Sequence, residues 1–143
     1  MLTLISHRRE NDVSAPSQDE ARIRLRLAPS DARYAGGLVP GSKVMEIFAD
    51  LETELALLEG GDEGLCAAYD SVEFLAPLRV GDYVEGVARV TSRGNSSRKV
   101  EARVYRVLSV DENGCRLEQD GPVLAATATA TIVVGRSRPA QAS

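Results

Sequence analysis

The chain has little of what nucleophilic and metal-dependent enzymes commonly use. Its 143 residues include a single histidine, His7, which lies in a polar segment near the N-terminus. This scarcity excludes Ser-His and Cys-His nucleophile pairs and any histidine-based metal site. Any catalysis by this chain is therefore expected to depend on carboxylates.

Cysteines and long apolar runs are scarce as well. Cys66 and Cys115 lack the Cys-x-x-Cys spacing of redox and zinc motifs, and the apolar stretch at the N-terminus is far shorter than the core of a signal peptide. A reducing, cytoplasmic location fits this pattern best. No apolar run approaches the length of a membrane span, so we expect no contact with a membrane.

Positive charge does not dominate the chain. Seventeen Lys and Arg residues stand against 21 Asp and Glu residues, which gives a formal net charge of −4. A nucleic-acid-binding domain would need a basic surface, so we expect no nucleic acid partner. One local basic cluster, Arg93, Arg98 and Lys99, lies beside a predicted turn.

Length and terminal polarity predict one domain. A chain of 143 residues with 43% hydrophobic composition is long enough for one compact core. Residues 1–20 and 135–143 hold few side chains that could enter this core, so we expect flexible tails there. The domain itself is expected to span residues 21–134.

Periodicity predicts a strand followed by one long helix. Residues 21–27 alternate arginine with apolar side chains, which is typical of a strand with one face in water, and Pro29 ends it. Ser42 is expected to cap a helix over residues 43–58, which the pair Gly60-Gly61 ends.

Four more strands are predicted after the helix, at residues 65–74, 83–92, 98–110 and 123–134, with a polar connection at 111–122. One helix on one face of a five-stranded antiparallel sheet is an α+β domain. The last strand alternates Ala126, Ala128 and Ala130 with threonines, which suits close packing on the alanine side. Exposed sheet edges are templates for pairing with another copy, so we expect a homodimer.

The predicted helix carries three carboxylates in one row. Glu46, Asp50 and Glu54 are spaced i, i+4 and i+8, which places them on a single stripe. At roughly 100° per residue, Glu54 falls at the shoulder of the apolar face, Asp50 lies further round, and Glu46 lies further still. Like charges at this spacing repel, so we infer a compensating use for the two inner acids, such as acid–base chemistry.

Four motifs and the element order carry a resemblance to a known family: Asp31-Ala32-Arg33-Tyr34, Gly37-Leu38-Val39, Asp50-Leu51-Glu52-Thr53-Glu54-Leu55 and Gly94-Asn95-Ser96-Ser97. Over about residues 21–134 the chain resembles the β-aminoacyl-CoA ammonia-lyases. The resemblance implies a hotdog fold, in which a five-stranded sheet wraps around one long central helix. It also implies reversible elimination of ammonia from a β-aminoacyl-CoA, such as 3-aminobutyryl-CoA, to give the enoyl-CoA. The expected assembly is a homodimer that shares its active sites, and the resemblance implies further assembly into a trimer of dimers. No metal is expected, and no cofactor other than the CoA of the substrate.

Elimination needs a base for the proton next to the thioester and a group that handles the leaving ammonium. Glu54, as the more desolvated acid, is the candidate base, and Asp50 is the candidate ligand of the ammonium. Backbone N–H groups at the helix start, reached past Gly36 and Gly37, are candidates to receive the enolate oxygen, with Tyr34 as a hydroxyl donor beside them. Two simpler interpretations stay open. Gly36 and Gly37 could serve only to form a turn, and Tyr34 could be only a packing aromatic side chain.

The resemblance further implies a set of residues that bind the substrate and its CoA moiety: Gly36, Gly37, Leu38, Asn95, Ser96, Ser97 and Arg98. The turn at 94–96 is equally consistent with a plain hairpin, and charged strand residues such as Arg98 are usually solvated.

Three other functions stay open at this point. One is an acyl-CoA thioesterase of the same fold, in which Asp50 or Glu54 would activate water or attack the carbonyl. Another is amine addition to an enoyl thioester on a carrier protein. The third is a module that binds acyl thioesters without turnover. The motif between Asp31 and Leu55 favours the lyase.

Overall fold

The computed structural model describes residues 19–60, 62–111, 113–117 and 121–134. Both tails expected from the sequence lie almost wholly outside these residues. The described chain forms β1 (Glu20–Arg26), α2 (Gly41–Gly60), β2 (Leu65–Phe74), β3 (Tyr83–Arg93), β4 (Ser97–Asp111), β5 (Gly114–Leu117) and β6 (Val123–Val133). Two short 3-10 turns, Pro29–Asp31 and Ala35–Gly37, lie between β1 and α2.

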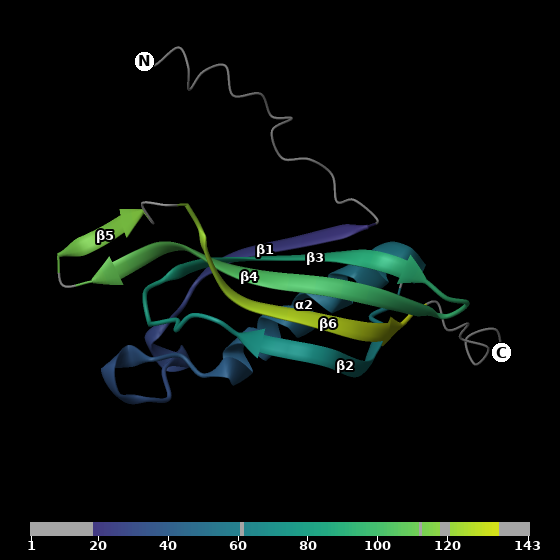
Figure 1. Cartoon of the computed structure of the whole chain (residues 1–143), viewed down its shortest axis with the longest axis horizontal. Helices are drawn as coiled ribbons and strands as arrows, with labels where there is room; N and C mark the ends of the chain where they lie inside the picture. The colour runs from purple at the N-terminus through teal and green to yellow at the C-terminus, as the bar shows by residue number, and fades with distance from the viewer. Residues whose placement is uncertain (1–18, 61, 112, 118–120, 135–143) are drawn as a thin grey trace, which may run out of the picture.

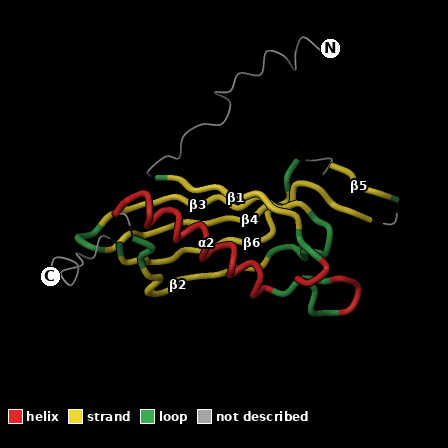
Figure 2. Tube along the Cα trace, turned by 180° about the vertical axis from the view of Figure 1, so that it is seen from behind, coloured by secondary structure: helices red, strands yellow, loops and turns green. Residues whose placement is uncertain are grey.

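One antiparallel sheet wraps along one side of the single long helix (Figures 1 and 2). The strands lie in the order β1-β3-β4-β6-β2, and the short β5 pairs with the far end of β4. This is the α+β hotdog architecture that the sequence predicted, with each of its five main strands within two residues of the predicted bounds. The expectation of a plain polar connection at 111–122 is wrong in one respect, because β5 forms there.

The helix buries its apolar face against the sheet. This face consists of Val44, Ile47, Phe48, Leu51, Leu55 and Ala56. Gly86 on β3 permits the close approach, since a Cβ atom there would lie 3.0 Å from both Ile47 Cγ2 and Leu51 Cδ1. On β6, Ala126, Ala128 and Ala130 are buried, as the alternation predicted.

The start of the helix differs slightly from the prediction. It begins at Gly41, so Ser42 lies inside the first turn instead of capping it. The difference is one of helix boundaries, which local sequence determines only to within a residue or two. No helix in the described part of the chain is long and apolar enough to cross a membrane.

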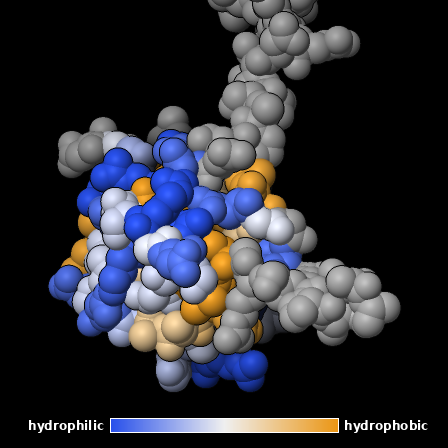
Figure 3. Space-filling model, turned by 90° about the vertical axis from the view of Figure 1, so that its right-hand side faces the viewer, coloured by the Kyte–Doolittle hydropathy of each residue, from blue (hydrophilic) through white to orange (hydrophobic). Residues whose placement is uncertain are grey.

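Strand β2 forms one edge of the sheet and exposes most of its residues. Leu65, at its start, is 66% exposed, and Phe74, at its end, is 57% exposed. Two register shifts, between Cys66 and Ala68 and between Tyr69 and Ser71, interrupt its pairing with β6. Figure 3 views the molecule from the end where β3 turns into β4, and there apolar areas lie among hydrophilic side chains.

Candidate active site

An apolar cavity of about 390 Å³ lies at the N-terminal end of α2. It is lined by Leu38, Val39, Gly41, Val44, Phe74, Leu75, Ala76, Pro77, Leu78 and Ala125. The lining comes from the loop before the helix, the first helical turn and the chain that leaves β2. A cavity with such a lining suits a short acyl chain.

Glycine at position 41 lets the ring of Phe74 lie over the start of the helix. A Cβ atom at Gly41 would be 2.9 Å from Phe74 Cζ, which is too close for any other residue without a shift of the ring. Backbone hydrogen bonds fix the neighbouring segments, since Val39 N donates to Leu78 O at 2.8 Å and Leu75 N donates to Ala125 O at 2.7 Å. The cavity is thus set by backbone geometry.

The predicted glycine pair lies close to this cavity in a turn with a left-handed backbone. Gly36 and Gly37 both have φ of 73°, a left-handed conformation that favours glycine. Val80 N donates to Gly37 O at 2.8 Å, and Arg79 Nη1 donates to Gly36 O at 3.2 Å. The pair therefore has a clear structural role in the turn, and its contact with the substrate stays a prediction.

Two residues of the Asp31-Ala32-Arg33-Tyr34 motif have different surroundings. Asp31 Oδ2 accepts a hydrogen bond from Ala28 N at 2.7 Å, and Asp31 Oδ1 lies 3.4 Å from Lys43 Nζ, which ties the loop to the helix start. Tyr34 is 60% exposed, so it is not packed within the described part of this chain. Its proposed role as a hydroxyl donor stays a prediction.

The row of acids on α2 follows the predicted gradient. Glu46 and Asp50 are exposed, and Glu54 is half-buried. None of the three lines the apolar cavity. Their catalytic roles, and the assignment of Glu54 as the base, stay predictions.

The buried acid of the helix is Glu52, which the sequence reasoning did not single out. It is 4% exposed, and its Oε2 accepts a hydrogen bond of 2.6 Å from the hydroxyl of Tyr69 on β2. Residues two apart on a helix point about 200° apart, so Asp50 and Glu54 face away from the β2 side. The sequence did contain a sign that Glu52 is buried. Glu52 follows the core residue Phe48 by four positions, and residues four apart lie on the same face of a helix.

Glu52 affects two neighbours on β2. Burial and the nearby carboxylate raise the pKa of the Tyr69 hydroxyl well above its ordinary value. The same two causes raise the pKa of the Cys66 thiol to about 11. Both groups are therefore protonated at neutral pH, which suits Tyr69 as the donor to Glu52.

The predicted CoA-binding turn lies at the opposite end of the helix. Gly94 N donates to Ser97 O at 2.8 Å and closes the turn, while Asn95 and Ser96 are exposed. Arg98 Nη1 donates to the carbonyl oxygens of Gly94 and Ser97 at 3.0 and 2.8 Å. Arg98 thereby braces this turn.

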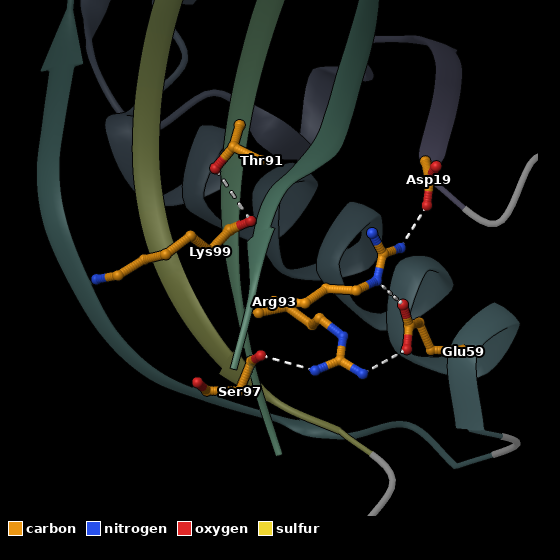
Figure 4. A network of polar contacts seen from close by, with 7 residues as sticks. Asp19, Glu59, Thr91, Arg93, Ser97 and Lys99 are labelled. Carbon is orange, nitrogen blue, oxygen red and sulfur yellow. Dashed lines mark hydrogen bonds and ion pairs between the residues drawn. The ribbon is translucent and has the colours of Figure 1, made fainter. Parts of the chain in front are cut away.

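Each cation of the local basic cluster has an acidic partner. Glu59, in the last turn of α2, accepts hydrogen bonds of 2.8 Å from Arg98 Nη2 and Arg93 Nε (Figure 4). Arg93 also pairs with Asp19, and Lys99 Nζ lies 2.9 Å from Asp70 Oδ2. Arg98 and then Arg93 lower the pKa of Glu59 against the opposing effect of burial. Contacts of Asn95, Ser96, Ser97 and Arg98 with CoA stay predictions.

No group of three or more His, Cys, Asp or Glu side chains in the described residues could hold a metal ion. Asp82, the other buried acid among the residues that the structure describes, accepts a hydrogen bond of 2.9 Å from Arg79 N and closes a turn.

Comparisons with known proteins agree with this fold and add evidence on the family of the chain. Residues 37–107 match the family model of the Thioesterase superfamily. The chain is 40% identical to 3-aminobutyryl-CoA ammonia lyase of Acetoanaerobium sticklandii over 119 residues, which cover 81% of this chain and 94% of that protein.

Two solved structures are also similar. The β-alanyl-CoA:ammonia lyase of Clostridium propionicum superposes with a TM-score of 0.77 and 29% identity, over 82% of this chain and 85% of that one. A hexameric broad-specificity acyl-coenzyme A thioesterase superposes with a TM-score of 0.67 and 25% identity, over 78% of this chain and 77% of that one. The similarity to the lyases is thus the greater of the two.

Proposed function

Because this chain belongs to the family of the 3-aminobutyryl-CoA ammonia lyases, we propose that it reversibly eliminates ammonia from a β-aminoacyl-CoA to give the enoyl-CoA. The observation that carries the proposal is the 40% identity across 94% of the curated lyase. The apolar cavity beside Gly41 and Phe74 supports it, because it offers a place for a short acyl chain.

The reaction requires one proton transfer and one bond cleavage. A carboxylate takes the proton from the carbon next to the thioester, the electron pair forms the Cα–Cβ double bond, and the C–N bond breaks toward nitrogen. The ammonia that leaves can then take the proton from the carboxylic acid. The backbone N–H groups at the start of α2 are suited to the charge that develops on the thioester oxygen.

The arrangement of the site favours a dimer. The apolar cavity lies at the first turn of α2, whereas the predicted CoA-binding turn is tied to Glu59 in its last turn. A helix of 20 residues is about 30 Å long, which is too far for one compact acyl site to use both ends of one chain. If two copies pair antiparallel along their β2 edges, the cavity of one copy approaches the opposite end of the other.

Three such dimers would form a hexamer like that of the similar thioesterase described as hexameric. Light scattering should therefore give a dimer or a hexamer at micromolar concentration. A monomer would contradict the shared site.

The nearest competing function is thioester hydrolysis, which the match to the Thioesterase superfamily brings into consideration. Butyryl-CoA separates the two, since it has an α-proton but no β-amino group. In deuterated water a lyase should exchange the α-protons of butyryl-CoA and leave the thioester intact. Sustained multiple-turnover release of free CoA would favour the hydrolase and overturn the proposal.

A further inference from the structure

The cavity at the start of α2 is unsuited to the ammonium group of a β-amino substrate. The side chains of the described residues that line it are all apolar. Carbonyl oxygens of its wall are engaged within the chain, since Ala125 O accepts from Leu75 N and Ala76 N at 2.7 and 3.2 Å, and Leu78 O accepts from Val39 N at 2.8 Å. An ammonium group buried here would lose its water without gaining a partner, which is strongly unfavourable. The cavity therefore fits an uncharged part of the acyl chain.

A β-aminoacyl thioester has an apolar part only beyond its β-carbon. Its first carbon carries the thioester, its α-carbon loses the proton, and its β-carbon bears the amine. A β-alanyl group ends at the β-carbon, whereas a 3-aminobutyryl group has one further carbon. The cavity volume of about 390 Å³ lies within the range of small-molecule pockets, about 300–1,000 Å³, and exceeds what one methyl group would fill.

Phe74 is the largest side chain in the wall of this cavity, and the start of the helix fixes its position. It is the last residue of β2, where it pairs with Ala126. Its ring lies on Gly41, since a Cβ atom there would lie 2.9 Å from Phe74 Cζ and 3.0 Å from Phe74 Cε1. The ring lines the cavity and yet is 57% exposed in the single chain, so it forms part of the outer wall. A ring in this place is suited to limit the length of a bound chain.

We propose that the cavity binds the apolar carbons beyond the β-carbon of a β-aminoacyl thioester, and that Phe74 limits how many of them fit. This proposal rests on the proposed lyase function, and it narrows the substrates to short chains with at least one apolar carbon beyond the amine. The amine and the thioester stay outside the cavity. Phe74 is a specificity-determining residue and takes no part in the proton transfer.

Calorimetric titration with saturated acyl-CoA thioesters tests the proposal without turnover. Propionyl-CoA ends at the β-carbon, and butyryl-, hexanoyl-, octanoyl- and decanoyl-CoA extend beyond it. Each methylene buried in the cavity should lower Kd roughly fourfold, so butyryl-CoA should bind roughly fourfold more tightly than propionyl-CoA. The gain should continue with each added carbon until the chain reaches Phe74, and should then stop. Equal Kd values across the series would overturn the proposal.

The exclusion of charge has its own matched ligand. 6-Aminohexanoyl-CoA has the same chain length as hexanoyl-CoA but ends in an ammonium group. Because this group would find no partner among the apolar side chains of the wall, 6-aminohexanoyl-CoA should bind more weakly than hexanoyl-CoA by roughly tenfold or more. Equal affinity of the two ligands would show that the cavity does not hold the end of the chain, and would overturn the proposal.

Phe74→Ala and Phe74→Leu test the limit on chain length. Both variants should fold, because the ring is exposed in the single chain. Phe74→Ala should move the tightest binding to longer acyl groups, and Phe74→Leu should move it by a smaller step. Leu65→Ala is the matched control, because Leu65 lies at the other end of β2, is 66% exposed and does not line the cavity. An unchanged series in Phe74→Ala, or the same shift in Leu65→Ala, would overturn the role of Phe74.

The outcomes separate this proposal from the lyase function. If the wild type adds ammonia to crotonyl-CoA but its titrations do not depend on chain length, the lyase function stands and the proposal for the cavity is overturned. Side chains of a second copy that filled the cavity would give this result, and Phe74→Ala would then change the oligomeric mass in light scattering. If the titrations depend on chain length and on Phe74 but no enoyl-CoA accepts ammonia, the apolar acyl site stands and the lyase function is overturned.

Discussion

The ion-pair network at the C-terminal end of α2 should contribute measurably to stability, and Glu59→Gln is the change that tests it. Glu59 accepts hydrogen bonds from Arg98 and Arg93, and thereby joins the helix to the β3–β4 hairpin (Figure 4). The amide of glutamine preserves the size of the side chain. It removes the negative charge between two guanidinium groups.

The expected magnitude follows from the exposure of the pair. The side chains of Arg98 and Glu59 are 13% and 14% exposed. Breaking a fully buried pair costs about 3–5 kcal/mol, and an exposed pair contributes about 0–1 kcal/mol. The Arg98–Glu59 pair is closer to the fully buried case, but the glutamine of the variant can still accept one hydrogen bond. We therefore expect a loss of about 2 kcal/mol in the free energy of unfolding.

Urea unfolding at a fixed protein concentration measures this loss. Asp70→Asn is the matched control, because Asp70 pairs with Lys99 through side chains that are 53% and 51% exposed. Its cost should stay below about 1 kcal/mol. If Glu59→Gln costs no more than Asp70→Asn, the reasoning from burial is refuted.

The same network predicts a pH dependence. The two arginines lower the pKa of Glu59 in the folded protein below its ordinary value of 4.5. A lowered folded pKa contributes stability that is present above the unfolded pKa and is lost as the pH falls through the folded pKa. The stability difference between wild type and Glu59→Gln should therefore be constant near neutral pH and shrink below about pH 4.5.

Other predictions concern the core and β2. Gly86→Ala should destabilise the protein by about 1–3 kcal/mol in urea unfolding, because its methyl group would press on core side chains of α2; an unchanged midpoint would contradict this packing. Tyr69→Phe leaves Oε2 of Glu52 without its donor and should lower the free energy of unfolding by about 1–3 kcal/mol. An unchanged free energy of unfolding would show that the Tyr69–Glu52 hydrogen bond does not stabilise the fold. In a Cys115→Ser background, Cys66 should react slowly with iodoacetamide at pH 8 and faster in Glu52→Gln, since Glu52 contributes to its raised pKa; equal rates would refute that coupling.

Much of the fold could be predicted because local patterns and tertiary packing agree. The alternation at residues 21–27 and the alanines of β6 correspond to one buried and one wetter face of the sheet. The short β5 was missed because its residues belong to a polar segment without clear alternation, and it forms only as an extension of β4. Its pairing depends on a neighbouring strand that no local pattern reveals.

The candidate site was harder to predict for a physical reason. Spacing along a helix shows that Asp50 and Glu54 share a stripe, but it does not show which side of the helix faces the sheet edge. That side is set by the contact between Glu52 and Tyr69, 17 positions apart in sequence. Similarly, the resemblance implied that Arg98 binds the CoA moiety, while its partner Glu59 lies 39 positions away. Long-range contacts of this kind decide roles that composition leaves open.

The most direct test of the lyase function is to incubate the wild-type protein with crotonyl-CoA and ¹⁵N-labelled ammonium, and to follow the products by mass spectrometry. We predict that the label enters a 3-aminobutyryl-CoA product whose thioester is intact, and that the same protein releases ammonium from this product when ammonium is removed. Accumulation of free CoA and crotonate without a labelled thioester would contradict the function proposed for this chain.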